Sequence, residues 1–192
     1  LQSSMYAISN MIIQVAVNLL GTATVAAWSL SGKIDGFYWA CSNAAGIAVM
    51  NFAAQNYGAG RMDRVHDCEK LSLKLFMGVT LLFSALLLGI GRSVLPVFND
   101  DAEVLAKTWQ VMLYMVPLYF TWTYIEIISG VLRGIGDAVV PVIIIGVGVC
   151  LLRVVWIATV YRSHPTMLNV CLAYPISWIV TDVAFFFYYR RV

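Results

Sequence analysis

The chain has 192 residues, of which 61% are hydrophobic and only 11% are charged, and its mean hydropathy is +0.82. Soluble domains have roughly 25% charged residues, so this composition predicts an integral membrane protein. A net charge of +2 without a basic stripe or tail excludes the nucleic-acid-binding classes. No metal site is predicted either, because the cysteines are far apart and form no C-x-x-C pair, at Cys41, Cys68, Cys150 and Cys171.

Six apolar runs follow one another along the chain, and each is long enough for a membrane helix, which needs roughly 20 apolar residues. They lie near 1–20, 25–57, 71–91, 108–132, 139–160 and 168–189. Short polar segments rich in turn-forming residues separate them. We therefore predict one all-α domain over 1–192, an integral membrane bundle of six transmembrane helices. Because the sequence starts at Leu1 without a methionine or a signal-peptide pattern, we expect a piece of a longer polypeptide.

The orientation follows from the basic residues, since lysine and arginine are enriched in cytoplasmic loops. One side of the predicted bundle collects seven of them, Arg61, Arg64, Lys70, Lys74, Arg133, Arg190 and Arg191, and the other side collects Arg92, Lys107 and Arg162. We therefore expect a multi-pass protein of the cell (inner) membrane, with both termini of this segment in the cytoplasm and the acidic "FNDDAE" turn outside.

Ionisable residues inside the predicted spans are the main functional signal, because a buried charge in a membrane costs several kcal/mol unless it is paired or hydrated. They are Lys33, Asp35, Glu126, Arg153 and Asp182. Lys33 and Asp35 are two residues apart on one helix, so they point to different faces and need partners on other helices. Asp35 and Arg153 lie at a similar depth below the outer surface, which predicts an Asp35–Arg153 ion pair with Gln14 and Asn18 at the same level.

Glu126 and Asp182 lie nearer the inner ends of their spans and form a second predicted cluster. Two interpretations stay open: static struts between helices, or stations along a water-filled path for ions. On its helix Glu126 shares a face with Tyr119, Trp122 and Ser129. A carboxylate beside aromatic rings suits an organic cation through charge and cation–π attraction, and the alternative is that both aromatic residues serve packing only.

Several stretches resemble the second half of the multidrug and toxic compound extrusion (MATE) transporters: "LQSSMYAISNMIIQ", "LGTATVAAWSLSGKIDGFYW", "FAAQNYGAG" and, most specifically, "SGVLRGIGDAVVP" at 129–141. The resemblance runs the length of the chain. It implies one six-helix lobe of a twelve-helix transporter, whose partner is the N-terminal lobe of the same polypeptide. It also implies alternating-access antiport in the lipid bilayer, exchanging sodium ions or protons for small organic cations, with no enzyme activity and no cofactor besides the coupling ion.

The resemblance assigns the R-G-x-G-D stretch to a tight cytoplasmic turn between the fourth and fifth helices. Arg133, Gly134, Gly136 and Asp137 would form this turn, with Pro141 in the opening of the next helix. We expect its charged residues to be structural. Some members of the family carry a cation-binding glutamate in the first helix of this lobe, where this chain has amides such as Gln14 and Asn18, so the coupling ion stays open.

Three competing classes remain. A lipid-linked oligosaccharide flippase of the same superfamily shares the helix count, although a more cationic cavity is expected for it. "GIGD" at 134–137 matches a pattern of intramembrane aspartyl proteases, but Asp35 lies too far out for a dyad with Asp137, and no tyrosine precedes Asp182. A purely structural membrane subunit is the third class, and it leaves the five intramembrane charges unexplained.

Overall fold

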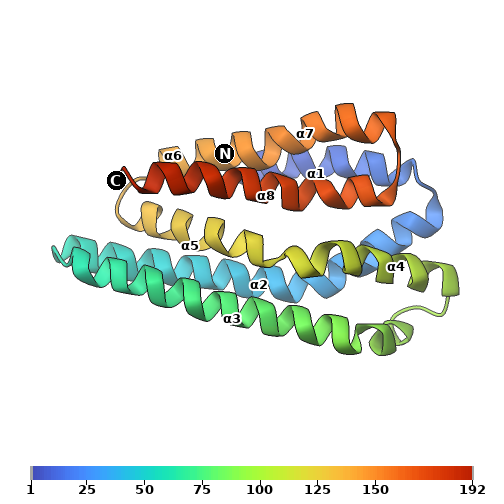
Figure 1. Ribbon diagram of the computed structural model, residues 1–192, viewed down its shortest axis with the longest axis horizontal. Coiled ribbons are helices and arrows are strands. Elements are labelled where there is room, and N and C mark those ends of the chain that lie inside the picture. The colour runs from blue at the N-terminus through green and yellow to red at the C-terminus, as the bar shows by residue number, and fades with distance from the viewer. Residues whose placement is uncertain (1, 192) are drawn as a thin grey trace.

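The computed structural model describes residues 2–191, and in this range its regular structure is helical throughout. Six helical segments run up and down along the long axis (Figure 1): α1 (Gln2–Asn18), α2 (Thr22–Gly58), α3 (Met62–Val94), α4 (Ala102–Met115) with α5 (Phe120–Gly134), α6 (Val139–Ile145) with α7 (Leu152–Trp156), and α8 (Met167–Tyr189). Wide π-type turns at Gly146–Leu151 and Ile157–Tyr161 extend α6 and α7 into one continuous span. The predicted all-α class is confirmed.

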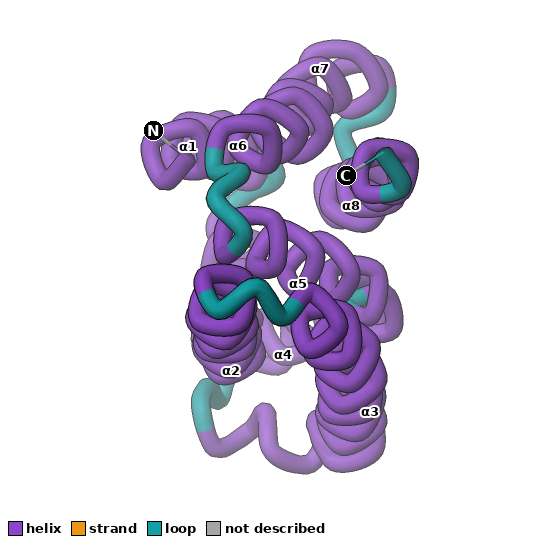
Figure 2. Tube along the Cα trace, turned by 90° about the vertical axis from the view of Figure 1, so that its left-hand side faces the viewer, coloured by secondary structure: helices purple, strands orange, loops and turns teal. Residues whose placement is uncertain are grey.

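The helices form two groups, which are visible when the bundle is viewed end-on (Figure 2). α2, α3, α4 and α5 make one group, and α1, the α6–α7 span and α8 make the other. α5 lies where the groups meet and packs against α8. Polar residues between the two groups are therefore enclosed by helices on both sides.

The outer face of α3 shows that the bundle is built for lipid. It exposes a continuous row of large apolar side chains, Leu71, Leu75, Val79, Leu82, Leu86 and Ile90. Apolar area of this extent is unfavourable in water and favourable against acyl chains. By length and apolar composition, Met62–Val97, Val139–Tyr161 and Met167–Tyr189 can each cross a bilayer, and the bent α4–α5 pair passes the same test when its two helices are taken together.

α1 and α2 fall outside that criterion for physical reasons. α1 has only 17 described residues, and α2, although 37 residues long, carries polar and charged side chains in its middle. Both helices lie alongside the apolar spans in the bundle. For these two helices, membrane crossing stays a prediction.

α2 and α5 pack closely against one another through glycines. A β-carbon on Gly130 would lie 2.9 Å from the carbonyl oxygen of Gly46, and one on Gly134 would lie 2.5 Å from the carbonyl oxygen of Met50. Gly130 and Gly134 are four residues apart, so they share one face of α5 and let the two backbones touch. Any larger residue at these positions forces the helices apart.

The α4–α5 span bends by 51° at a short 3₁₀ turn that contains Pro117. Proline lacks an N–H, so a backbone carbonyl in the preceding turn loses its helical partner. Side chains from neighbouring helices donate to carbonyls at the bend: Ser84 Oγ to Val116 O at 3.0 Å and the Tyr38 hydroxyl to Tyr119 O at 3.1 Å. The bend is therefore held by α2 and α3 as well as by the proline.

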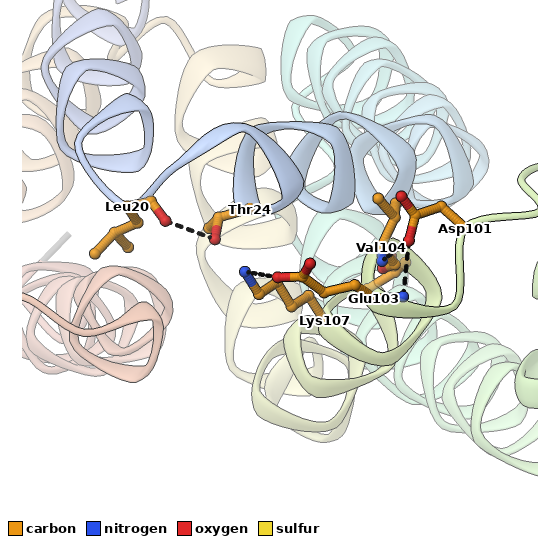
Figure 3. Close-up of polar contacts among 7 residues, drawn as sticks. Leu20, Thr24, Asp101, Glu103, Val104 and Lys107 are labelled. Atoms are coloured by element: carbon orange, nitrogen blue, oxygen red, sulfur yellow. Dashed lines mark hydrogen bonds and ion pairs between the residues drawn. The ribbon is translucent and has the colours of Figure 1, made fainter.

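The start of α4 carries a well-formed cap (Figure 3). The Asp101 carboxylate accepts the backbone N–H groups of Glu103 and Val104 at 2.8 and 3.3 Å, which satisfies donors that a helix start leaves free. Lys107 pairs with Glu103 one turn further along at 2.8 Å. The cap fixes the direction in which the chain enters the bent span.

Candidate functional site

Three adjoining cavities lie between the two helix groups. The inner cavity, about 300 Å³, contains Glu126, the middle cavity, about 390 Å³, contains Arg153, and the outer cavity, about 270 Å³, contains Asp35. Trp39 borders all three. Tyr6 and Trp122 are shared by the inner and middle cavities, and Asn10 and Tyr174 by the middle and outer ones. The cavities form a continuous row of polar and aromatic groups along the bundle.

In the inner cavity, α5 supplies both a carboxylate and a cation. The Glu126 side chain lies against the backbone of α2, where a β-carbon on Gly46 would be 2.0 Å from its Oε1. One turn earlier, Trp122 Nε1 donates to Ser42 Oγ at 3.0 Å. Arg133 borders the same cavity and donates from Nε to the carbonyl oxygen of its own-helix residue Ser129 at 3.1 Å. The glycine thus makes the room that the carboxylate occupies.

In the middle cavity, Arg153 is 4% exposed. Its guanidinium carbon lies 4.0 Å from the centre of the Tyr174 ring and 5.9 Å from that of Trp178. Its Nε donates to Ser177 Oγ at 3.1 Å. All three partners belong to α8, so α8 holds the charged group in place through one hydrogen bond and two aromatic faces.

The outer cavity is bordered by Asp35 of α2 and Gln14 of α1. Asp35 Oδ1 is buried and accepts no hydrogen bond from any residue in the range 2–191, although the Tyr119 hydroxyl lies close by. Gln14 Nε2 donates to Asn18 Oδ1 on its own helix at 2.9 Å. An unneutralised buried carboxylate oxygen is costly, and such a group is a candidate ion or proton site.

The predicted Asp35–Arg153 ion pair is wrong. Across residues 2–191, no carboxylate oxygen lies within 4.0 Å of the Arg153 guanidinium. Counting residues along each helix gives the depth of a side chain, but it does not give the direction in which the side chain points around the helix axis. Asp35 and Arg153 occupy neighbouring cavities, and Tyr174, which borders both, takes the guanidinium on its ring.

The structure leaves four of the predicted residues outside the row of cavities. Lys33 is exposed on the side of α2 that faces α3, next to Phe83. Asp182 lies in an apolar groove with Tyr124 on the outer side of α5 and α8. Tyr119 is buried and stacks on Tyr38 at 4.6 Å, and Asn18 is exposed at the end of α1. The cavities therefore contain two carboxylates and two guanidinium groups, a balance that the sequence did not predict.

Sequence reasoning missed most of the side chains that make up the walls. Tyr6 and Asn10 of α1, Trp39 of α2 and Tyr174 of α8 all border the middle cavity. A signal existed for two of them, because Tyr6, Asn10 and Gln14 are spaced by four residues and so share one helical face. Tyr174 lay in an apolar run with no such pattern.

The R-G-x-G-D stretch forms a tight turn after α5. Gly136 has φ of 98°, a left-handed conformation that glycine adopts without strain. The Asp137 N–H then donates to Leu132 O at 2.9 Å, which closes the end of the helix as in a Schellman motif. Pro141 lies in the first turn of α6, where a missing N–H leaves no helical bond unmade.

Asp137 joins this turn to the end of α8. Its Oδ1 accepts from the Val140 N–H at 3.4 Å and its Oδ2 accepts from the Tyr188 hydroxyl at 2.5 Å. The first contact caps α6 and the second ties α8 to the turn. These contacts give Asp137 a structural part, and they occupy both of its carboxylate oxygens.

Apolar helices around a row of charged and aromatic cavities define a multi-pass membrane protein. The profile of the MatE family matches residues 1–159, and the chain belongs to this family. It is 24% identical over 183 residues to the probable multidrug resistance protein YoeA of Bacillus subtilis (strain 168), covering 92% of this chain and 38% of the relative.

Two solved structures share the fold. A MOP superfamily transporter from Pyrococcus furiosus superposes with a TM-score of 0.87 at 18% identity, over 98% of this chain and 42% of that one. The Vibrio cholerae MATE transporter VcmN in its bent form gives a TM-score of 0.87 at 14% identity, over 99% of this chain and 43% of that one. The chain therefore spans about two fifths of the length of these relatives.

Proposed function

We propose that this chain forms the C-terminal lobe of a secondary active efflux transporter that exchanges sodium ions or protons for cationic drugs or other toxic organic cations. Membership of the MatE family and the similarity to a probable multidrug resistance protein support this class. The observation that carries the proposal is the row of three cavities, which contains two carboxylates among aromatic side chains.

The inner cavity suits the cargo. Glu126 supplies a negative charge, and Trp39, Trp122 and Tyr6 supply aromatic walls that attract an organic cation over their ring faces. Together the inner and middle cavities fall in the size range of small-molecule sites, roughly 300–1,000 Å³. Cargo bound here is held by one charge and several apolar surfaces, a combination that accepts many cations of similar size.

The outer cavity suits the coupling ion. The unpaired Asp35 oxygen is neutralised when a proton or a sodium ion binds it, which removes the cost of a buried charge. Binding then favours the state of the lobe in which Asp35 is most buried, and cargo at Glu126 favours another. The lobe rocks against the N-terminal lobe of the same polypeptide and exposes the cavities to each side in turn.

We further propose the orientation that the basic residues indicate, in the cell (inner) membrane with both ends of this segment in the cytoplasm. In this orientation the inner cavity extends toward the cytoplasmic end of α5, where Arg133 borders it. Cargo then reaches Glu126 from the cytoplasm, as export requires.

The test uses the complete transporter polypeptide in proteoliposomes, with efflux of a fluorescent organic cation driven by a sodium or proton gradient. Glu126→Gln removes the charge at nearly constant volume, and we expect efflux to fall by about tenfold, the equivalent of one lost charge contact. Asp67→Asn is the matched control, since it removes an exposed carboxylate of α3 that borders none of the three cavities, and it should keep wild-type efflux. Equal efflux in the Glu126 variant and wild type would overturn the assignment.

A further inference from the structure

Lys33 of α2 is a charged residue that borders none of the three cavities. Across residues 2–191, no carboxylate oxygen lies within 4.0 Å of its ammonium nitrogen. A charge inside a membrane costs several kcal/mol unless a partner neutralises it or it reaches the interface. The group that neutralises Lys33 must therefore come from outside the described residues.

A lateral pocket of about 160 Å³ surrounds this lysine between α2, α3 and α4. α3 contributes one face of its last turns, with Phe83, Leu87, Gly91 and Val94 spaced by three or four residues. Among the described residues that border the pocket, only Lys33 is charged. The volume is below the roughly 300–1,000 Å³ of small-molecule sites, so the pocket fits part of a flexible chain rather than a whole transported solute.

The pocket lies at the end of a membrane span. α3 ends at Val94, at the opposite end of the bundle from the C-terminus (Figure 1). A lysine side chain leans toward the start of its own helix, and the start of α2 lies at this same end. The flexible stem of Lys33 can therefore carry the ammonium toward the level at which acyl chains meet their headgroups. In the proposed orientation, this level belongs to the outer leaflet.

The rim of the pocket is apolar and exposed. Phe37 is 75% exposed, Phe98 is 54% exposed and Val94 is 39% exposed. Water would solvate Lys33 and leave this apolar area unfavourably hydrated. A hydrocarbon chain alone would cover the area and leave the charge unpaired. A molecule with an anionic head and an apolar tail satisfies both the charge and the rim.

We propose that this pocket binds an anionic phospholipid of the adjoining leaflet, with its phosphate at the Lys33 ammonium and part of one acyl chain between α2 and α3. Lysine pairs with phosphate as a point charge. A zwitterionic phospholipid carries its own ammonium beside the phosphate, so a single lysine favours a lipid with a net negative charge, such as phosphatidylglycerol. The site is separate from the three cavities and does not depend on which solute they take.

Trp109 gives a local signal for the experiment, because a β-carbon on Gly91, which borders the pocket, would lie 3.2 Å from its ring atom Cζ3. The complete transporter polypeptide is reconstituted in phosphatidylcholine vesicles that contain a rising fraction of phosphatidylglycerol with brominated acyl chains, which quench tryptophan on contact. The quenching that is lost in a Trp109→Phe variant is the signal of the site. In wild type we expect half-maximal quenching at about a fivefold lower fraction of brominated phosphatidylglycerol than of brominated phosphatidylcholine, the effect of one lysine beside an anionic lipid.

Four variants separate the pocket from general surface charge. Lys33→Gln should make the two lipids equivalent. Arg92→Gln is the matched control, since it removes an exposed charge from the last turn of α3 outside the pocket, and it should keep the preference. Lys33→Arg keeps the positive charge and should retain the preference, which covers the case in which the neutral variant fails to fold. Val94→Phe narrows the rim, and it should weaken quenching by both lipids.

Equal half-maximal fractions of the two lipids in wild type would overturn the proposal, and so would a preference that survives Lys33→Gln. Soluble glycerol phosphate that displaced the brominated lipid as well as unlabelled phosphatidylglycerol does would also overturn it, since the site would then bind a free anion. The measurement follows binding and involves no transport, so its outcome is distinguishable from a failure of the proposed efflux function.

Discussion

Glu126 lies directly over Gly46, so closely that a β-carbon on the glycine would be 2.0 Å from the carboxylate oxygen. Gly46→Ala must therefore displace Glu126 or separate α2 from α5. We expect a loss of about 1–3 kcal/mol in stability, the usual cost of overpacking, together with impaired efflux. Thermal unfolding in detergent, followed by intrinsic fluorescence, measures the first effect.

Gly36→Ala is the matched control for this substitution. Gly36 lies on the same helix with open space around its α-carbon and no unusual φ. There the added methyl group favours the helix by about 0.5–1 kcal/mol. If both variants unfolded at the same temperature, the close approach of Gly46 to Glu126 would not be a constraint on the lobe.

The bend in the α4–α5 span depends on side chains of two other helices. Ser84→Ala and Tyr38→Phe each remove one hydrogen bond to a carbonyl at the bend. Because the carbonyls are buried, we expect each variant to lose about 1–3 kcal/mol. Ser29→Ala, an exposed serine on α2, should leave the unfolding midpoint unchanged. Midpoints that are equal for the Ser84 and Ser29 variants would show that Pro117 alone holds the bend.

The Asp101 cap predicts a smaller effect outside the membrane. Asp101→Ala frees the N–H groups of Glu103 and Val104, and we expect a loss of about 1 kcal/mol. Asp100→Ala removes the same charge from the neighbouring exposed position and should cost less. Unfolding in detergent is the measurement, and an equal loss in both variants would assign the effect to charge rather than to capping.

The proposed orientation is tested by labelling with a maleimide that does not cross membranes. Asp63→Cys and Asp100→Cys place thiols at exposed positions at opposite ends of the bundle. In intact cells we expect labelling at position 100 and none at position 63 until the membrane is opened. The parent chain, with its four cysteines, gives the background. The reverse labelling pattern would contradict the proposed orientation, because it would place the end of the lobe with the inner cavity on the outer side of the membrane.

The sequence predicted the helices well and the site only in part. A long apolar run indicates a helix that faces lipid. The predicted bounds of the last two spans, 139–160 and 168–189, therefore lie within about two residues of the helix ends in the structure. Apolar runs do not predict which side chain contacts Arg153, because that contact depends on how α7 and α8 are rotated about their axes. Depth alone suggested Asp35, whereas the structure gives Tyr174 and Ser177.

Lys33 and Asp182 illustrate the same limit. Both are charged residues inside predicted spans, and nothing in the residue pattern distinguishes them from Asp35 and Glu126. The structure places Lys33 on the side of α2 that faces α3, and Asp182 in a groove on the outer side of α5 and α8. The packing of a helix against its neighbours decides whether a polar residue on it borders an internal cavity or lies on the outer surface of the bundle.

The two π-type turns on either side of Arg153 affect how this span tolerates changes of length. A deleted residue in an ordinary membrane helix rotates every later side chain by about 100°. A π turn contains one residue more than the α-helical path requires, so a deletion within 146–151 or 157–161 can be absorbed as a local return to α-helix. Arg153 then keeps its direction toward Tyr174. α3 is α-helical over Met62–Val94 and contains no extra residue of this kind, so a single deletion there turns its exposed row of large apolar side chains out of register.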